Sequence, residues 1–462
     1  MTQKNKGLWG ETIAAVSTPP GTGAIGIVRM SGDRTTEILE EVVPSCRGKL
    51  EPKKAHIGWV RDPRDGKRID EVVVLFFKGP RSFTGEDVGE LHGHGGRKNL
   101  ERILEVVLEK GARVAKPGEF SKRGFLNGRM DLSKAESIAR LIEAKTKRAC
   151  EIAVNQMGGM LGKRIQKAGE RLNQVMVELE ARVDFPEEEL DLIQEAGVEE
   201  VLREVGKDLE RLVKSYEYGS MVGEETTVGI VGKANVGKSC LLNRILGKKR
   251  ALVDERPGTT RDFVEGCLPM GGGVVRFVDT AGWRESSEKL EIEGKELAKE
   301  ELKTARLIIV VQDATRGQGE EDREVWEEFK EKEKIPVWNK MDLIEDREEE
   351  KWKGMWGERS RTVSAKEGWG VEDLLEEVEE RVFGGLEGAE EDLVVTERRH
   401  VERLKKALEC LKRARKRMDE GAPEEIVIID IRQAKKEMEK IVGRRVGRDV
   451  LGAIFERFCI GK

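Results

Sequence analysis

A glycine-rich loop at positions 232–239, G-K-A-N-V-G-K-S, has the residue types needed to bind phosphates. In the pattern G-x-x-x-x-G-K-[ST], backbone N–H groups surround the phosphates, the lysine reaches the outer phosphates and the hydroxyl binds Mg²⁺. Lys238 and Ser239 occupy these last two positions. The loop residues expected to contact nucleotide are Asn235, Val236, Gly237, Lys238, Ser239 and Cys240. The loop therefore predicts a nucleoside triphosphate as ligand.

Two downstream segments have residues that respond to the terminal phosphate in nucleotide-dependent switches. Thr260 is expected to close onto Mg²⁺ and the outer phosphate, and Asp279 to hold Mg²⁺ through water. The amide of Gly282 is expected to sense the γ-phosphate. The nucleotide contacts predicted in these segments are Asp254, Glu255, Arg256, Pro257, Gly258, Thr259, Thr260, Asp279, Thr280, Ala281 and Gly282.

The sequence N-K-M-D at positions 339–342 selects the base. Asp342 can accept two hydrogen bonds from N1 and the exocyclic amine of guanine, which adenine cannot supply. The contacts predicted here and in the last base-side loop are Asn339, Lys340, Asp342, Ser364, Ala365 and Lys366. Five motifs in this order, each after a predicted strand, indicate an enzyme that binds and hydrolyses GTP.

Short elements must position these motifs. Apolar runs predict strands over residues 228–231, 274–278 and 336–338. A helix over residues 240–246 is expected to direct its N-terminus at the phosphates. These elements are typical of a Ras-like, doubly wound P-loop domain.

The flanking regions have different patterns. Predicted strands over residues 25–28 and 71–77, with a helix near 98–110, indicate an α+β domain. Apolar residues at spacings of three and four predict helices over residues 161–183 and 401–411. Neither helical part offers a complete bundle alone, so we expect one helical domain made of both.

The predicted fold class is thus multidomain α/β. Residues 1–118 form an N-terminal α+β domain, 119–222 the first part of an all-α helical domain, 223–383 an inserted GTPase domain, and 384–462 the second helical part.

Composition bounds the function further. The 462-residue chain has 37% charged and 38% hydrophobic residues and a net charge of −5, which gives no global attraction to nucleic acid. Its six cysteines lack a C-x-x-C pair, which favours a reducing compartment over a zinc site. No apolar stretch approaches about 18 residues, and the N-terminus lacks a signal-peptide core. We expect a soluble, cytoplasmic protein without membrane contact.

Basic clusters near the C-terminus allow two interpretations. The clusters are Lys405-Lys406, Lys412-Arg413 and Arg415-Lys416-Arg417. They form either a local patch for RNA or the solvated face of a charge-rich helix.

Further ordered segments extend along the whole chain. The N-terminal ones are T-P-P-G at 18–21, G-I-V-R-M-S-G at 26–32, F-T-G-E-D at 83–87 and H-G-H-G-G at 92–96. The later ones are P-G-E-F at 117–120, F-L-N-G-R-M-D-L at 125–132 and C-I-G-K at 459–462. With these segments the chain resembles the tRNA-modification GTPases of the MnmE or TrmE family.

The resemblance implies a homodimer formed through the N-terminal domains, with a folate-binding site there. It also implies a flavoprotein partner of the MnmG or GidA type, which carries FAD and forms a heterotetramer or larger complex. Together such proteins use a one-carbon unit of tetrahydrofolate, carried as 5-formyl-tetrahydrofolate or a related folate. They install an aminomethyl-type (carboxymethylaminomethyl) group on carbon 5 of the wobble uridine of certain tRNAs.

The folate residues that the resemblance implies are Arg29, Glu90, Arg129 and Lys462. Cationic groups suit a glutamate-tailed ligand, and Glu90 can accept hydrogen bonds from a pterin amine. For each of these residues a surface ion pair is the alternative. Cys459 is either a nucleophile or redox thiol, or a small buried residue near the folate.

Trp283 stands where Ras-like enzymes have a glutamine that orients water. The resemblance implies K⁺ in place of an arginine finger, which neutralises charge between the phosphates. Its implied ligands are the Asn235 side chain and backbone carbonyls of Asp254, Arg256 and Thr259. Ser239 and Thr260 are the implied Mg²⁺ ligands. The implied catalytic residues are Glu291, Asn235 and Thr260, with Glu291 orienting water or, alternatively, lying on a helix surface.

This sequence departs from the family pattern at two positions. Ala234 replaces the usual proline, which loosens a turn, and Trp283 replaces a smaller aliphatic residue.

Two other functional classes stay open. A ribosome-assembly GTPase would be favoured by an appended RNA-binding domain, and a dynamin-like protein by a longer stalk with a membrane-binding segment. Neither feature is evident here.

Overall fold

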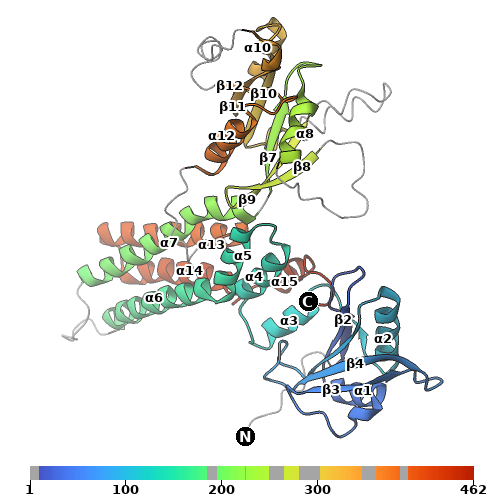
Figure 1. Ribbon diagram of the computed structural model, residues 1–462. Coiled ribbons are helices and arrows are strands. Elements are labelled where there is room, and N and C mark those ends of the chain that lie inside the picture. The colour runs from blue at the N-terminus through green and yellow to red at the C-terminus, as the bar shows by residue number, and fades with distance from the viewer. Residues whose placement is uncertain are drawn as a thin grey trace. The chain divides into compact units, whose positions relative to one another are not determined.

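The computed structural model describes residues 10–184, 195–223, 225–248, 265–279, 302–345, 360–384 and 394–462 (Figure 1). The chain divides into two compact units. Unit 1 comprises residues 1–139, 157–193 and 413–462, and unit 2 comprises residues 140–156 and 194–412.

The N-terminal part of unit 1 is a six-stranded sheet with strand order β3-β4-β5-β2-β1-β6. Its elements are β1 (Ile13–Val16), β2 (Ile25–Ser31), α1 (Thr35–Val42), a 3₁₀ turn (Pro44–Cys46), β3 (Ala55–Arg61), β4 (Arg68–Phe77), β5 (Val88–His94), α2 (Arg97–Glu109) and β6 (Arg113–Val114). All neighbours are antiparallel except β1 and β6. The predicted α+β architecture is confirmed.

Helices α1 and α2 cover one face of this sheet, because alternate strand residues point toward them. Val28, Val74 and Leu91 from the strands pack with Ile38 and Ile103 from the helices in one buried core. The opposite face has partly or fully exposed residues. Part of this face, at β1 and the end of β2, is covered by Phe120 and Arg123 of the next helix.

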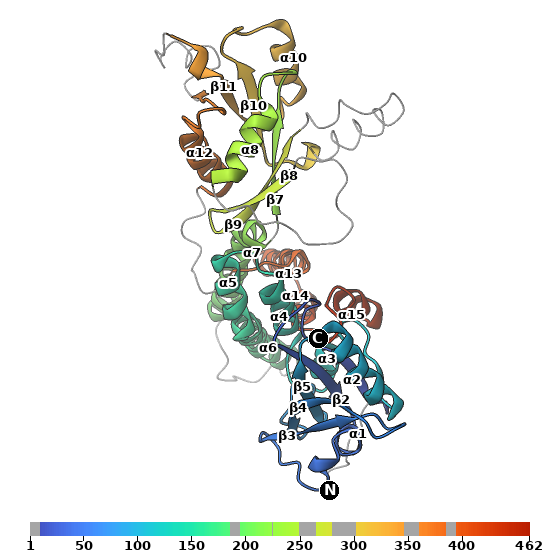
Figure 2. The same cartoon turned by 45° about the vertical axis from the view of Figure 1, so that its right-hand side comes forward.

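The remaining helices of unit 1 are α3 (Glu119–Leu126), α6 (Met160–Asp184), α14 (Glu424–Ile441) and α15 (Arg448–Phe455), together with most of α4 (Leu132–Glu143). Leu161, Ile165, Ala168, Leu172 and Leu179 are buried at the predicted spacing along α6. Helices α6 and α14 pack side by side (Figures 1 and 2).

Unit 2 contains a second six-stranded sheet with strand order β12-β11-β10-β7-β9-β8. Its elements are β7 (Glu225–Val231), α8 (Lys238–Lys248), β8 (Glu265–Met270), β9 (Gly273–Asp279), β10 (Leu307–Asp313), α10 (Glu320–Glu328), β11 (Glu333–Asn339), a 3₁₀ turn (Met341–Leu343), β12 (Arg361–Thr362) and α12 (Val371–Phe383). The strands are parallel except β8. Helices α8 and α12 cover one face and α10 the other, so the sheet is doubly wound as predicted.

Three further helices are α5 (Lys147–Met157), α7 (Glu195–Gly223) and α13 (Arg398–Asp419). The predicted helix over residues 401–411 is confirmed as part of α13, which ends before Gly421. Among the described residues, no helix is both long enough and apolar enough to cross a membrane.

Candidate functional site

The phosphate-binding loop connects β7 to α8, and its shape depends on positive φ angles. Gly237 has a φ of +96°, and a Cβ at this position would lie 2.3 Å from Nδ2 of Asn339. Asn235 has a φ of +65°, which asparagine tolerates better than most residues, and its side chain is exposed. The loop thus closes against a buried residue and leaves Asn235 accessible.

Lys238 and Ser239 lie at the start of α8, as the motif predicts. The Lys238 ammonium donates to the carbonyl oxygens of Gly232 and Lys233, at 2.9 and 2.7 Å. Ser239 Oγ donates to Oδ2 of Asp279, at 2.6 Å. The parallel pairing of β7 and β9 places Asp279 beside Ile230, at the end of the sheet where the loop begins. A hydroxyl and a carboxylate at this separation are oxygen donors of the kind that Mg²⁺ prefers.

The polar side chains of the N-K-M-D motif connect it to neighbouring segments of unit 2. Asn339 donates to the carbonyl of Val236 at 2.8 Å and accepts from the amide of Ala365 at 2.9 Å. Asp342 accepts a hydrogen bond from Ser364 Oγ at 2.7 Å. Asn339 therefore ties the phosphate-binding loop to the segment at residues 364–366, and Ser364 of that segment holds Asp342.

The side chain of Lys340 is held by Asp313, a residue that the sequence analysis did not identify. Its backbone has a φ of +68°, and its ammonium donates to Oδ2 of Asp313 at 2.7 Å. Asp313 is buried at the end of β10, directly opposite Asn339. Burial alone would raise the pKa of this carboxyl, but hydrogen bonds from Lys340 and Thr315 lower it overall. Its position at the end of a strand that begins with five apolar residues was a signal that could have identified it.

The other base-side residues are placed by the end of α8. Arg244 donates to the carbonyl of Ala365 at 2.9 Å and also to that of Lys366, whose side chain is exposed. Val236 lies in the core and Cys240 is exposed. Several predicted residues lie outside the described residues: Asp254, Glu255, Arg256, Pro257, Gly258, Thr259, Thr260, Thr280, Ala281, Gly282, Trp283 and Glu291.

A second polar site lies on the sheet of unit 1. The antiparallel register places Arg29 of β2 opposite Glu90 of β5, and Arg29 Nε donates to Glu90 Oε1 at 2.8 Å. His92 lies 2.9 Å from the other carboxylate oxygen of Glu90. The Arg29 guanidinium also lies over the rings of Phe83 and Phe120, 5.7 and 5.9 Å from their centroids. The strands thus bring together two of the four predicted folate residues.

The C-terminal residues complete this site. Ser17 Oγ and Arg29 Nη1 approach the carbonyl of Gly461 at 3.2 and 3.5 Å, and the amide of Phe120 donates to the Lys462 carbonyl at 3.2 Å. Burial, followed by the charge of Arg29, lowers the pKa of the Lys462 ammonium. Lys462 therefore belongs to the same cluster as Arg29.

Arg129 and Cys459 lie at the edge of this cluster. Arg129 Nε donates to the carbonyl of Ser82 at 3.0 Å, next to the Phe83 that Arg29 contacts. Cys459 has an exposed side chain, and its carbonyl accepts from Gly118 at 3.4 Å. The interpretation of Cys459 as a small buried residue is therefore wrong.

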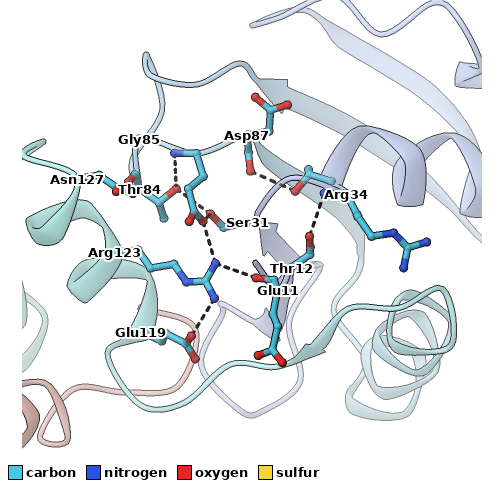
Figure 3. Close-up of polar contacts among 12 residues, drawn as sticks. Glu11, Thr12, Ser31, Arg34, Thr84, Gly85, Asp87, Glu119, Arg123 and Asn127 are labelled. Carbon is cyan, nitrogen blue, oxygen red and sulfur yellow. Dashed lines mark hydrogen bonds and ion pairs between the residues drawn. The ribbon is translucent and has the colours of Figure 1, made fainter. Parts of the chain in front are cut away.

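Next to this cluster, between Ser31 of β2 and helix α3, a buried charge network supports this region (Figure 3). Arg123 is fully buried and donates to Glu86 at 2.9 Å and to Glu119 at 3.0 Å. Ser31 Oγ donates to the same Glu86 oxygen at 2.8 Å. Although burial opposes ionisation, hydrogen bonds from Arg113, the Lys116 amide and Arg123 lower the pKa of Glu119 to about 2. Sequence reasoning missed this network, because its members come from separate segments.

Two family models match this chain, one in its N-terminal part and one over the remainder. Residues 12–129 match the family model for the N-terminus of the GTP-binding protein TrmE, and residues 132–459 match the model for the MnmE helical domain. One solved structure, Era in complex with MgGDPNP and part of 16S ribosomal RNA, is 32% identical and covers 34% of this chain and 57% of its own, but its TM-score of 0.28 supports no inference.

Curated relatives match nearly the whole chain. The tRNA modification GTPase MnmE of Clostridioides difficile (strain 630) is 40% identical over 98% of this chain and 99% of its own length. That of Aquifex aeolicus (strain VF5) is 41% identical over 98% and 100%. That of Moorella thermoacetica (strain ATCC 39073 / JCM 9320) is 40% identical over 98% and 99%. The chain belongs to the MnmE family of tRNA modification GTPases.

Proposed function

We propose that this tRNA modification GTPase is activated by potassium and acts with an FAD-dependent flavoprotein of the MnmG type. In this proposal it uses a one-carbon unit of tetrahydrofolate to install a carboxymethylaminomethyl-type group at carbon 5 of the wobble uridine. One observation carries the proposal: the chain has a second polar site, formed by Arg29, Glu90 and Lys462, in a different unit from its nucleotide motifs. A GTPase without further chemistry has no need of it.

The residues of the second site fit a folate. Arg29 and Lys462 supply positive charge for the glutamate tail, and Glu90 is an acceptor for pterin N–H groups. The rings of Phe83 and Phe120 supply apolar surface under Arg29. When bound, the folate supplies the one-carbon unit. The protein's own contribution is to orient it, with Arg129 at the edge.

In the nucleotide site, the described residues have three roles. Lys238 binds the outer phosphates, which replace the loop carbonyls as acceptors of its hydrogen bonds. Ser239 and Asp279, whose side-chain oxygens lie 2.6 Å apart, would hold Mg²⁺. Asp342 binds guanine, held by Ser364. When bound, Mg²⁺ and K⁺ supply positive charge where negative charge develops on the phosphates.

The potassium assignment rests on Asn235, whose exposed side chain and positive φ place it at the rim of the phosphate-binding loop. The other proposed ligands are Asp254, Arg256 and Thr259 for K⁺ and Thr260 for Mg²⁺, with Glu291 orienting water. We expect GTP hydrolysis to be at least about tenfold faster in KCl than in NaCl, and Asn235→Ala to abolish this difference while GDP affinity is retained. Equal rates of the wild-type protein in both salts would remove potassium from the proposal.

We further propose a cytoplasmic homodimer with domains 1–118, 119–222, 223–383 and 384–462. The face of the N-terminal sheet opposite α1 and α2 supports dimer formation, because it displays apolar residues. Ile25 and Ile57 are 66% and 70% exposed there. Apolar surface of this kind is typical of protein interfaces.

The decisive experiment is mass spectrometry of wobble uridines in tRNA incubated with this protein, the flavoprotein, folate and GTP. The expected result is a modified uridine that requires all four components. A product that forms equally without folate, or in the Arg29→Ala variant, contradicts the role given to the second site.

A further inference from the structure

A groove with a cavity of about 410 Å³ lies between helices α6 and α14 of unit 1. Both helices appear side by side in Figures 1 and 2. The residues that line the groove are Asn173, Met176, Val177, Glu180, Arg432, Lys435, Lys436, Glu439 and Arg445. Neither the nucleotide site nor the Arg29 cluster includes any of them.

The groove is positively charged in an acidic chain. Its lining has four cationic side chains and two carboxylates, whereas the whole chain has a net charge of −5. Arg432 donates to Glu180 at 2.7 Å, and Lys435 donates to Asn173 at 2.9 Å. These contacts hold the cations in place while leaving further N–H donors for a ligand, since a guanidinium has five and an ammonium three.

The backbone after α14 turns sharply to bring a fourth cation to the groove. Gly443 has a φ of +89°, and Arg445 has a φ of +60°, which is unusual for a residue with a long side chain. Arg445 Nε lies 3.2 Å from Glu439 of α14. A strained backbone that positions a charged side chain is a feature of ligand-binding sites.

We propose that this groove binds the sugar-phosphate backbone of the substrate tRNA. The proposal rests on the tRNA-modifying function of the family. Cationic side chains of arginine and lysine are the standard partners of phosphates. Such phosphate contacts carry no information on base sequence, and the lining has no aromatic side chain on which bases could stack. The same lack disfavours a protein partner, whose binding energy usually depends on aromatic anchors.

The basic clusters of α13 offer a weaker site. Arg413 and Arg417 both pair with the buried Asp430, at 3.3 and 2.7 Å, and Lys416 pairs with Glu420 at 3.7 Å. These cations share carboxylates, as Arg432 and Arg445 do in the groove, so the comparison turns on the two lysine pairs, Lys435 with Lys436 and Lys405 with Lys406. Lys405 and Lys406 are exposed and lie along the outside of a helix rather than in a groove. They form a matched control, because each site has two consecutive lysines.

The test compares two double variants of the full chain, Lys435→Glu/Lys436→Glu and Lys405→Glu/Lys406→Glu, which change the net charge equally. Binding of end-labelled tRNA is measured with GTP hydrolysis on the same preparations. We expect the groove variant to lose at least about tenfold in tRNA affinity and the α13 variant less than about threefold. Neither should change GTP hydrolysis without tRNA, because neither pair lies among the nucleotide motifs.

Two further measurements separate charge from folding. Lys435→Gln/Lys436→Gln should reduce the slope of log affinity against log salt by about 2, since each phosphate contact contributes about 0.9. Lys436→Arg, which keeps the charge, should keep the affinity. A groove variant that loses flavoprotein binding but retains tRNA would overturn the proposal in favour of a protein partner. Equal tRNA loss in both double variants, or no tRNA binding by the wild-type chain, would also overturn it. Normal GTP hydrolysis and uridine modification alongside such results would leave the proposed function standing.

Discussion

In the nucleotide site, Lys238 donates to two carbonyls of its own loop, whereas in the N-terminal sheet Arg29 pairs with another side chain, Glu90. The hydrogen bonds of Lys238 thus support the loop when no phosphate is near. A phosphate can replace the two carbonyls as their acceptor, and no carboxylate loses a cation as a result. Arg29 cannot move away in this manner, because Glu90 would lose its cation. The first arrangement suits a switch that exchanges partners, and the second suits a rigid pocket.

The two sites also differ in how far apart their parts lie in sequence. The described residues that we predict to contact the nucleotide lie between positions 235 and 366, in one continuous stretch of the chain. The other site joins Arg29 to Gly461, which are 432 residues apart. Linear motifs therefore reveal the first site, while the second depends on the fold of all of unit 1.

The strongest test of the nucleotide site is Asp342→Asn. The amide cannot accept both guanine hydrogen bonds, so we expect GTP affinity to fall about 1,000-fold and xanthine nucleotides to be preferred. Fluorescent-nucleotide binding measures both affinities. The Arg29 site should be unaffected, with unchanged folate affinity. An unchanged preference for GTP would show that Asp342 does not contact the base.

The Arg29 site can be tested by replacing Arg123, the centre of the buried charge network that supports it. Arg123→Met leaves Glu86 and Glu119 buried without this cation, and we expect unit 1 to lose about 3–5 kcal/mol of stability. Hydrogen exchange of residues 10–129 should report the loss, while GTP binding in unit 2 persists. Arg113→Met is the matched control. It also removes a cation from Glu119, but Arg113 is 34% exposed and its loss leaves Arg123 paired with both carboxylates, so the loss of stability should be smaller than in Arg123→Met. Equal losses in the two variants would contradict the role of burial.

Replacing Arg29 tests whether the Arg29–Glu90 pair binds a ligand. Because charged hydrogen bonds contribute about 1.5–3 kcal/mol each, Arg29→Ala should weaken 5-formyl-tetrahydrofolate binding about 10- to 100-fold. Calorimetric titration measures this affinity. Arg34→Ala removes an exposed arginine of the same domain, which pairs with Glu37, and serves as control. Equal affinities of both variants would reduce Arg29–Glu90 to a structural ion pair.

The smallest effect concerns Lys462. Its pKa is lowered, so its charged form is lost at a lower pH than for an ordinary lysine. Folate affinity should therefore fall as the pH rises from 7 toward 10, by less than about tenfold. Lys462→Arg should remove this part of the pH dependence, because a guanidinium stays protonated. Identical pH profiles in both proteins would exclude Lys462 from ligand binding.

Local sequence predicted the fold class and several of the elements, because these follow from apolar periodicity and from motifs of fixed spacing. It identified Lys238, Ser239 and Asp342 by the same reasoning. Asp313 escaped prediction because its role depends on the register of β10 against β11. Arg29 and Glu90 were implied only by family resemblance, since nothing local indicates that β2 pairs with β5. The roles of Glu291 and Asn235 in hydrolysis stay predictions.

The contact between Arg29 and Gly461 has a consequence for the order of events during translation. Ribosomes add roughly 5–20 residues per second, so the 432 positions between these residues take roughly 20 to 90 s. Domains generally fold as their residues emerge. A nascent chain therefore completes its guanine nucleotide site while the Arg29 site still lacks its C-terminal part.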